Sequence, residues 1–403
     1  MLDRWESEQL GALTSLITSG SRGWGEFYSD NGNPFIRMTN LPREGIRLAL
    51  SDLRFVKLPG GSSEGQRTQI RKGDILISIT AELGKIGFVD FEPDRAAYVN
   101  QHVCLVRLQE GSVDPEFLAA YLAAAPQRKL FNRLNDAGAK SGLNLKTIER
   151  FPVRFPPLPE QRKIAEILRA WDEAIEKLQA LRAAKESRFA AISQKLLGPS
   201  RAIGRNIPNS NWTLTTFGDV FTERKDRSNG LGVDDVVTVG KYAIRKQSEH
   251  FSRSVASKDQ SNYWVISSGD FVYDPMSAYY GALGRYDGVQ DGIVSPAYRV
   301  VQLCPSVCSD FMVDLLRSHH IRFLLETRSS QGNKEGKRRL LQRDEFAGIE
   351  FNLPPMTVQK EISRKLALFR QDIAATEKEI ELVTSQKRGL MQKLLTGEWR
   401  VAC

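Results

Sequence analysis

The sequence FPPLPEQRKIAEILRAWDEAIEKLQALRAAKESRFAAISQKLLG, residues 155–198, decides the architecture because the chain contains it twice. The second copy, LPPMTVQKEISRKLALFRQDIAATEKEIELVTSQKRGLMQKLLTG, occupies residues 353–397. The two copies align without a gap for about 40 residues at a constant offset of 198 positions. Self-similarity at long range is the signature of a repeated architecture. The chain is therefore predicted to be one layout built twice.

Each copy is predicted to form a long amphipathic helix that begins just after a proline pair. Pro156-Pro157 and Pro354-Pro355 disfavour helix before them. The apolar residues that follow recur in steps of four and three, which is typical of a coiled-coil seam with charges on the other faces. Each helix of roughly 38 residues would be about 57 Å long. The predicted seam consists of Ile164, Leu168, Trp171, Ile175, Leu178, Phe189, Ile192 and Leu196 in the first copy, and of Ile362, Leu366, Phe369, Ile373, Ile380, Val383, Leu390 and Leu394 in the second.

Two matched seams in one chain predict that the helices pair with each other, antiparallel about their middles. Arg182 and Lys185 interrupt the first seam, and Thr376 and Lys387 interrupt the second. In the antiparallel register Arg182 would lie opposite Thr376. The alternatives are that each helix packs on its own domain, or that it joins two copies of the chain.

Length, charge and cysteine content limit the classes of protein to which this chain can belong. The 403 residues suffice for two domains with connecting elements, and 57 basic against 48 acidic residues give a net charge of +9, which permits a polyanionic partner without requiring one. The four cysteines and four histidines are too few and too scattered for a disulfide framework or a zinc site, and Cys304 and Cys308 are predicted to be ordinary thiols. No apolar run approaches the 18 residues of a membrane span, and no signal peptide opens the chain. A soluble, cytoplasmic protein with no membrane partner is therefore predicted.

The remainder of the chain is predicted to form two β-rich α+β globules, at 1–155 and 199–353. Strand patterns separated by turn clusters recur in both, and Gly73-Asp74 in the first matches Gly269-Asp270 in the second. Asp114-Pro115 is predicted to start a helix that runs through Phe131. The scaffold residues repeat while the loops between them do not, which is typical of two recognition modules. The alternative is that duplicated globules drift in their loops without consequence.

No stretch carries its own catalytic motif. Neither a dinucleotide-binding glycine pattern nor a phosphate-binding loop is present. Ser295-Pro296-Ala297-Tyr298 is one residue away from the loop of an amino-methyltransferase, but it aligns with Asn100-Gln101-His102-Val103 and is predicted to be scaffold. Pro93-Asp94 and Glu335-Gly336-Lys337 lie in different globules and do not form a nuclease metal site. His319-His320 is predicted to lie on a solvated helix face, so no catalytic or metal site is expected.

Basic, glycine-spaced segments precede each long helix and suit contact with phosphates, which supply affinity and register. The alternative is a solvated run of charge. The predicted contacts there are Lys140, Ser141, Asn144, Lys146, Lys334, Lys337, Arg338, Arg339 and Arg343. Base reading needs polar or basic side chains on exposed loops, and the candidates are Arg22, Trp24, Arg67, Gln69, Arg224, Lys225, Arg227, Lys241, Tyr242 and Arg245. Trp24 and Tyr242 have the alternative role of loop anchors.

A family resemblance rests on the entry to the first long helix, Phe155-Pro156-Pro157-Leu158-Pro159-Glu160-Gln161. Together with the Lys72-Gly73-Asp74-Ile75-Leu76 strand and the Gln-Lys-Leu-Leu helix ends, it resembles the specificity subunit of type I restriction-modification systems. The resemblance covers essentially the whole chain as globule, helix, globule and helix. The second copy departs from it at Thr357-Val358-Gln359, where the counterpart of Glu160 is not acidic. That departure weakens the capping or partner contact expected there.

The resemblance implies an α+β protein in which two target recognition domains, 1–155 and 199–353, are separated by antiparallel spacer helices, 156–198 and 354–403, with an internal pseudo-two-fold repeat. Each domain would read one half of a bipartite, asymmetric site in double-stranded DNA. The helices would set the gap and dock two methyltransferase subunits that methylate adenine, and restriction/translocase subunits would join to cleave. The chain itself would be non-catalytic and bind no cofactor, with methyl donor, ATP and Mg on the partner subunits. The alternatives are a coiled-coil scaffold that binds only proteins, and a self-contained restriction-modification enzyme.

Overall fold

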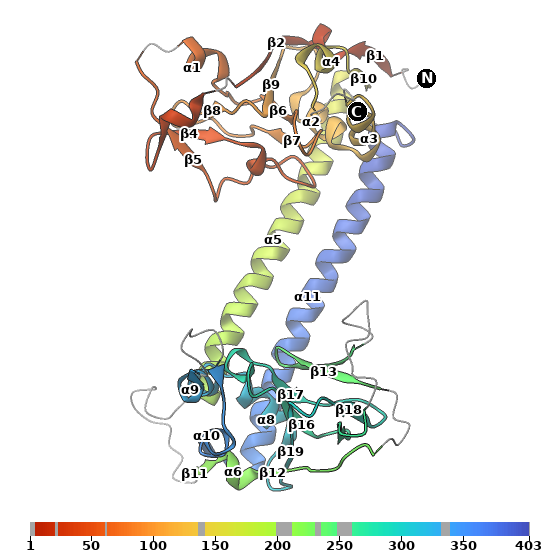
Figure 1. The fold of residues 1–403 in the computed structure, drawn as a ribbon. Helices are drawn as coiled ribbons and strands as arrows, with labels where there is room; N and C mark the ends of the chain where they lie inside the picture. The colour runs from red at the N-terminus through yellow and green to blue at the C-terminus, as the bar shows by residue number, and fades with distance from the viewer. Residues whose placement is uncertain are drawn as a thin grey trace. The chain divides into compact units, whose positions relative to one another are not determined.

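The computed structural model divides the chain into two compact units. Unit 1 consists of Met1–Gln179 and Lys378–Cys403, and unit 2 consists of Ala180–Glu377. The structure describes residues 5–20, 23–60, 63–135, 142–198, 212–229, 235–247, 260–331 and 339–402. Each unit contains one β-rich globule and part of both long helices (Figure 1).

Unit 1 is built on a four-stranded antiparallel sheet in the order β2-β9-β6-β7, made of β2 (Thr14–Ser19), β9 (Val103–Leu108), β6 (Ile75–Ser78) and β7 (Ile86–Phe88). A second sheet has the order β3-β5-β4-β8, made of β3 (Tyr28–Ser29), β5 (Arg54–Val56), β4 (Asn33–Ile36) and β8 (Tyr98–Val99). The ribbon β1 (Glu6–Gln9) with β10 (Pro152–Phe155) leads into the first long helix. Among the described residues of this globule, the α-helices are α1 (Ser63–Thr68), α2 (Pro115–Ala123), α3 (Ala125–Arg133) and α4 (Leu145–Glu149).

Unit 2 repeats the first of these sheets as β12-β19-β16-β17, made of β12 (Phe221–Glu223), β19 (Arg299–Leu303), β16 (Phe271–Tyr273) and β17 (Leu283–Arg285). It also repeats the ribbon, as β11 (Thr213–Thr216) with β22 (Glu350–Leu353). The remaining strands form two-stranded sheets: β13 (Val237–Gly240) with β14 (Ala243–Lys246), β15 (Trp264–Ile266) with β18 (Gly292–Val294), and β20 (Ser330–Gln331) with β21 (Arg339–Leu340). The α-helices that the structure describes in this globule are α6 (Phe217–Val220), α8 (Ser309–Leu316), α9 (His319–Arg328) and α10 (Arg343–Ala347).

The repeat is confirmed by equivalent residues at equivalent places in the two four-stranded sheets. Gly73 and Gly269 both adopt positive φ, +89° and +94°, at the turn that enters the central strand. The aspartate that follows each glycine accepts a hydrogen bond from a backbone N–H three residues earlier, at 2.7 Å for Asp74 and 2.8 Å for Asp270. The shared sheet is where the two halves of the sequence match. The other sheets differ between the units, as the non-repeating loops predict.

The helix predicted from Asp114 through Phe131 is instead two helices, α2 and α3. Asp114 caps α2 as predicted, since its side chain accepts from the Phe117 N–H at 2.9 Å. The backbone at Ala124 is extended (φ −65°, ψ 150°), because Pro126 has no N–H to continue the ladder. The single-helix prediction is therefore wrong, and the reason is one proline.

The long helices are α5 (Leu158–Leu197, 40 residues) and α11 (Met356–Thr396, 41 residues). Within unit 2, Arg182 lies 3.4 Å from Glu377, and the Lys185 Nζ lies 2.8 Å from Asp372 and 2.9 Å from the Thr376 hydroxyl. These contacts confirm the antiparallel pairing, with Lys185 rather than Arg182 on Thr376. Within unit 1, Lys387 pairs with Asp172 in the same register.

The seam residues fall into two groups. Five of them are buried in the cores of the globules: Ile164, Leu168 and Leu394 in unit 1, and Ile362 and Leu366 in unit 2. The others are half-buried, because a pair of helices covers only one face of each: Trp171, Ile175, Leu178, Phe189, Ile192, Leu196, Phe369, Ile373, Ile380, Val383 and Leu390. The long helices therefore pair with each other and also pack on the globules. Both the predicted pairing and the alternative of packing on a globule are confirmed. The division of the chain into four parts by residue number stays a prediction.

Candidate nucleic-acid interface

In both units the segment before the last short helix lies against the turn of the central β-hairpin. The Leu143 N–H donates to the Ile79 carbonyl at 2.9 Å, and the Leu341 N–H donates to the Pro275 carbonyl at the same distance. Leu143 and Leu341 are separated by 198 positions, the offset of the long helices. We call these surfaces the hairpin edges: residues 79–83, 100–102 and 142–144 in unit 1, and residues 274–281 and 339–341 in unit 2. The scaffold thus brings the ends of both predicted phosphate segments to equivalent places.

The predicted phosphate contacts have different surroundings. Lys140, Ser141, Lys334, Lys337 and Arg338 lie outside the described residues. Lys146 is exposed on α4, and Arg343 is exposed but pairs with Glu223 at 2.8 Å. Arg339 lies at the unit 2 hairpin edge, with its guanidinium 5.3 Å from the centre of the Tyr279 ring.

Asn144 is exposed and also caps a helix, and its contact with phosphate stays a prediction. Its side-chain oxygen accepts from the Thr147 N–H at 2.8 Å, which satisfies a backbone donor at the start of α4.

Of the base-reading candidates of unit 1, Trp24 is buried, Arg67 is exposed but bound to the protein, and Arg22 lies outside the described residues. Trp24 is 4% exposed and stacks on Phe35 with ring centres 5.1 Å apart, so it is a loop anchor and the prediction of a base contact is wrong. Arg67 donates to the Thr18 hydroxyl at 2.6 Å. The half-buried Gln69 forms a backbone β-bridge with Tyr98 of β8, a strand of the second sheet.

Arg224 of unit 2 is corrected from a base contact to a structural cation. In unit 1, Arg107 binds the buried Asp74 through two hydrogen bonds of 2.8 and 2.7 Å. In unit 2 the counterpart of Arg107 is Gln302, and Arg224 supplies the missing cation to Asp270 at 2.6 Å. A glutamine where the repeat has an arginine is the sequence signal that could have identified this role.

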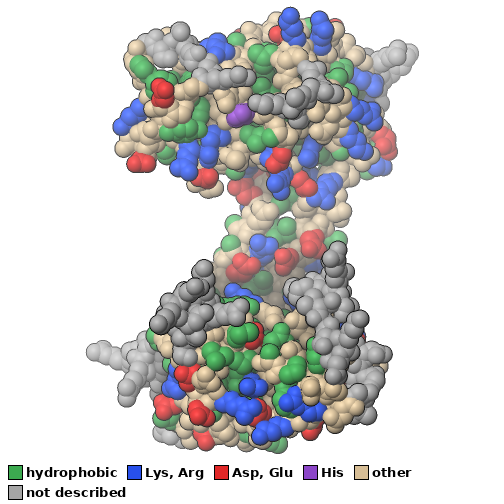
Figure 2. Space-filling model, viewed as in Figure 1, with side chains coloured by type: hydrophobic (Ala, Val, Ile, Leu, Met, Phe, Trp, Pro, Cys, Tyr) green, Lys and Arg blue, Asp and Glu red, His purple; other side chains and the backbone are tan. Residues whose placement is uncertain are grey.

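Unit 2 has a groove of about 390 Å³ between β14, β17 and α8, and of the other candidates only Tyr242 and Arg245 are among its lining residues. Arg245 lines this groove, and Lys225 and Lys241 are exposed elsewhere in the unit. Arg227 lies over the Trp264 ring at 3.3 Å and donates to the Asn262 carbonyl, which leaves it bound to its own globule. On the faces that Figure 2 shows, Lys and Arg side chains are interspersed with Asp and Glu.

Tyr242 is a loop anchor beneath the unit 2 hairpin edge. Its φ of +54° is unusual for a bulky residue, and its N–H donates to the Gly281 carbonyl at 2.7 Å. The ring fills the space beside Gly281, where an added Cβ would lie 2.7 Å from the Tyr242 Cζ. Burial raises the pKa of the Tyr242 phenol above its usual value.

The hairpin edge of unit 1 holds polar residues that motif analysis missed. His102 Nδ1 lies 2.8 Å from the Thr80 hydroxyl, and His102 Nε2 lies 3.1 Å from the side-chain nitrogen of Gln101. With the Gln101 amide nitrogen as donor, His102 Nε2 accepts, and Nδ1–H can donate to Thr80. Gln and His side chains can pair with base edges. In the sequence, these residues could have been found as a polar run, Asn100-Gln101-His102, at the place where the second globule has Ser295-Pro296-Ala297.

Similarity to known proteins agrees with this layout. Residues 5–185 match the family described as type I restriction modification DNA specificity domain. A putative type I restriction enzyme MjaX specificity subunit from Methanocaldococcus jannaschii is 22% identical over 364 residues, which cover 82% of this chain and 79% of that protein. Residues 5–185 thus resemble a DNA specificity domain of type I restriction-modification systems. A second relative, the putative specificity subunit S.MpnORF507P from Mycoplasma pneumoniae, is 26% identical over 149 residues, 33% of this chain and 41% of that protein.

Solved specificity subunits share the fold over nearly the whole chain. The S subunit from M. genitalium superposes with a TM-score of 0.54 at 14% identity, over 97% of this chain and 96% of that one. The HsdS subunit from Thermoanaerobacter tengcongensis gives 0.52 at 15% identity, over 98% and 97%. A chain from a study of complex assembly in the type I R-M system gives 0.60 at 15% identity, over 98% of each. The α+β class with two long helices is confirmed by these likenesses.

Across the described ranges, no helix combines the length and the apolar character that crossing a bilayer requires. Nor do the described residues bring together three His, Cys, Asp or Glu side chains that could ligate a metal ion.

A buried glutamine holds each long helix on its globule. Gln161 accepts from the Asp114 N–H at 2.8 Å and donates to the Pro156 carbonyl at 2.7 Å. Gln359 does the same with the Cys308 N–H at 2.7 Å and the Pro354 carbonyl at 2.8 Å. Both glutamines are 1% exposed. The repeated Gln thus ties the start of each long helix to the cap of α2 or α8.

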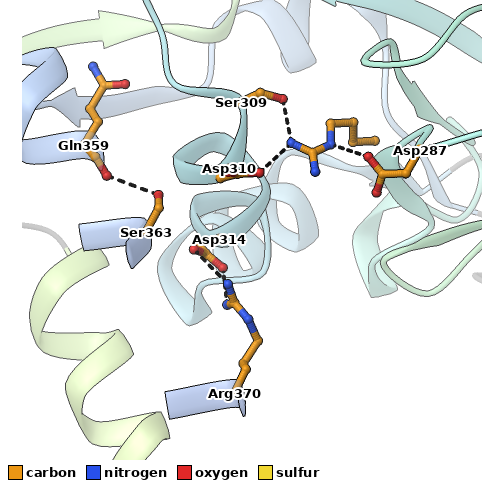
Figure 3. A network of polar contacts seen from close by, with 8 residues as sticks. Asp287, Ser309, Asp310, Asp314, Gln359, Ser363 and Arg370 are labelled. Carbon is orange, nitrogen blue, oxygen red and sulfur yellow. Dashed lines mark hydrogen bonds and ion pairs between the residues drawn. The ribbon is translucent and has the colours of Figure 1, made fainter. Parts of the chain in front are cut away.

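In unit 2 a buried ion pair adds to this attachment (Figure 3). Arg370 of α11 pairs with Asp314 of α8, whose side chain is 3% exposed. Burial raises the pKa of the Asp314 carboxyl, and the charge of Arg370 opposes that rise. The same helix α8 is tied to β17, since Arg285 binds Asp310 at 2.7 Å and Ser309 at 2.9 Å.

Glu160 has a role in unit 1 that its counterpart in the second copy does not have. Its carboxylate accepts from Arg400 Nε at 2.8 Å and Nη2 at 2.7 Å, and from the Val401 N–H at 3.2 Å. These donors belong to the segment that follows α11, so the carboxylate holds the end of the chain in unit 1. Val358, its counterpart, is a partly buried member of the unit 2 core and offers no such site.

The Glu160 contact predicts a pH-dependent stability of unit 1. The hydrogen bonds from Arg400 hold the pKa of the Glu160 carboxyl below its usual value. A depressed pKa in the folded state contributes stability that is present above the unfolded pKa and is lost as the pH falls through the folded pKa. We expect Glu160→Gln to lower the free energy of unfolding by about 1.5–3 kcal/mol at pH 7. The difference from wild type should shrink below about pH 4.

Urea unfolding of both proteins at pH 7 and at acidic pH measures this effect. Arg400→Met is the matched partner variant, because a double-mutant cycle isolates the pair. A difference that stays constant over the whole pH range would contradict the role of the ionised carboxylate.

Proposed function

We propose that units 1 and 2 each read one half of a bipartite DNA site in a type I restriction-modification complex. The observation that supports this is one scaffold whose equivalent hairpin edges carry different chemistry. The edge of unit 1 presents Thr80, Gln101 and His102, and the edge of unit 2 presents Met276, Tyr280 and Arg339. Two different surfaces select two different sequences, so the site is asymmetric.

Affinity and specificity have separate sources in this proposal. Lys146 and the other basic residues beside the hairpin edges contact phosphates and fix the register on the duplex. Polar and apolar contacts at the edges distinguish the bases, and each mismatched base pair should cost about 1–3 kcal/mol. Lys225, Lys241 and Arg245 remain candidates for either role in unit 2.

The long helices are proposed to set the gap between half-sites and to dock two methyltransferase subunits. Leu181, Leu368 and Leu382 lie on these helices outside the seam, and they are 46%, 57% and 55% exposed. Apolar side chains kept on the outside of a helix pair favour a helical partner. Restriction/translocase subunits would bind the same complex, and methyl donor, ATP and Mg would be held by the partners. The specificity subunits are a non-catalytic family.

Mapping of methylated adenines tests the reading of DNA. Deleting the gene for this chain, while its methyltransferase partners remain, should abolish methylation at one bipartite motif with two different halves separated by a fixed gap. Restoring the chain should restore the motif. An unchanged methylation pattern would refute DNA reading and favour the protein-binding scaffold. Label transfer to DNA by the purified chain alone would identify a self-contained enzyme.

A further inference from the structure

We propose that the turn between β16 and β17, Asp274–Gly281, is an apolar wedge that unit 2 packs against base pairs of its half-site, with Met276 and Tyr280 at its tip. This inference rests on the proposed reading of duplex DNA. It adds a contact that basic and polar motifs did not reveal.

The tip of this turn exposes apolar side chains to water, and this exposure does not stabilise the folded protein. Met276 is 49% exposed and Tyr280 is 46% exposed. Tyr279 meets Tyr280 edge to face, with ring centres 5.5 Å apart. Hydrophobic side chains also reach the visible face of the unit that carries β16 and β17 (Figures 1 and 2). An exposed apolar cluster of this kind marks a binding surface.

Hydrogen bonds and packing within the chain hold this turn. The Met276 N–H donates to the Asp274 carboxylate at 3.0 Å, and the Asp274 carbonyl accepts from Ser277 at 3.0 Å and from Ala278 at 2.7 Å. Gly281 closes the turn at φ +105° against the ring of Tyr242. A tip held in one conformation loses little entropy on binding, so its apolar contacts are available for affinity.

The charges around the tip favour duplex DNA over a protein partner. Arg339 lies over Tyr279 at 5.3 Å, and Arg322 of α9 lies beside the Tyr242 phenol beneath the turn. Two acidic residues lie beside the tip: Glu326 is paired with Arg339 at 3.4 Å, and the Asp274 carboxylate accepts from the Met276 N–H at 3.0 Å. Apolar side chains inserted at a base step while nearby arginines bind phosphates are a known mode of DNA deformation. Methionine is among the residues used as such wedges.

The equivalent turn of unit 1 lacks these features. Ala81 is exposed there at φ +58°, and Glu82 is paired with Lys85 at 2.7 Å. The wedge therefore belongs to unit 2 alone. Its removal should affect one half-site and leave the other unchanged.

The test uses the specificity subunit assembled with its methyltransferase partners and a short duplex that carries the mapped motif. Met276→Ser with Tyr280→Ser should weaken binding roughly 5- to 150-fold, the range for loss of stacking on one base. A 2-aminopurine placed in the unit 2 half-site should lose the fluorescence increase seen with wild type, and one in the other half-site should not. Leu214→Ser is the matched control, because Leu214 is 64% exposed on β11 of the same unit. The conservative Met276→Leu should bind like wild type.

The possible outcomes separate this inference from the proposed function. Wild-type affinity and wild-type fluorescence in the double variant would overturn the wedge. Loss of a methyltransferase subunit from the variant complex in sedimentation would also overturn it, and would assign the tip to a protein partner. A wild-type complex with no sequence preference would overturn the proposed function itself, whatever the variants do.

Discussion

Seven residues inserted into both long helices, before Arg182 in α5 and before Thr376 in α11, are expected to widen the gap of the recognised site by about three base pairs. Seven residues add about 10.5 Å of helix, and successive base pairs of B-DNA are about 3.4 Å apart. Two whole turns also keep the seam on the facing helix, because the seam repeats every seven residues. Both half-sites should stay unchanged, since neither hairpin edge is touched.

The insertion points follow from the register of the helix pair. Lys185 contacts Asp372 and Thr376, and Arg182 contacts Glu377, so the two points lie opposite each other. An insertion in only one helix would shift one seam against the other, and we expect it to abolish specific binding. Adenine-methylation mapping of the doubly lengthened protein reads the new gap directly. An unchanged gap, or altered half-sites, would show that the helices do not set the spacing.

Replacing Arg370 with leucine is expected to destabilise unit 2 by about 3 kcal/mol, the lower end of the range for breaking a buried ion pair. The Asp314 carboxylate is 3% exposed and would lose its cation. The lower end applies because 38% of the Arg370 side chain is exposed, so water already screens part of the attraction.

The pH dependence of this variant has a definite sign. Burial already raises the pKa of Asp314, and loss of Arg370 removes the charge that opposes the rise. A folded state that binds the proton more tightly than the unfolded chain loses stability as the pH rises through these values. Arg370→Leu should therefore be most destabilised at neutral pH and recover at acidic pH.

Hydrogen exchange in the α8 segment Ser309–Leu316 measures this loss within unit 2. Adding Asp314→Asn to Arg370→Leu should restore much of the protection, because the amide carries no charge to bury. Arg364→Leu is the control, because Arg364 is exposed on α11, the helix that also carries Arg370. This variant should leave the exchange of α8 unchanged. Equal protection in Arg370→Leu and wild type would show that the pair contributes little.

The sequence predicted the elements that depend on local patterns. Proline pairs and apolar spacing located α5 and α11, Asp114 identified the start of α2, and the offset of 198 positions revealed the duplicated scaffold. The basic segments before α4 and α10 were also visible. Each of these depends on residues a few positions apart or on direct repetition, so no knowledge of distant contacts was needed.

The surroundings of single side chains were decided by tertiary structure. Arg224 and Arg245 look alike in the sequence, but Asp270, which follows 46 positions after Arg224, binds only the former. Trp24 is a base-reading candidate in the sequence but is buried against Phe35, while Met276 and Tyr280 belong to no motif and lie exposed beside Arg339. Periodicity determines which segments form helices and strands because it acts through neighbours along the chain. Exposure and pairing are decided by groups that only the folded chain brings together.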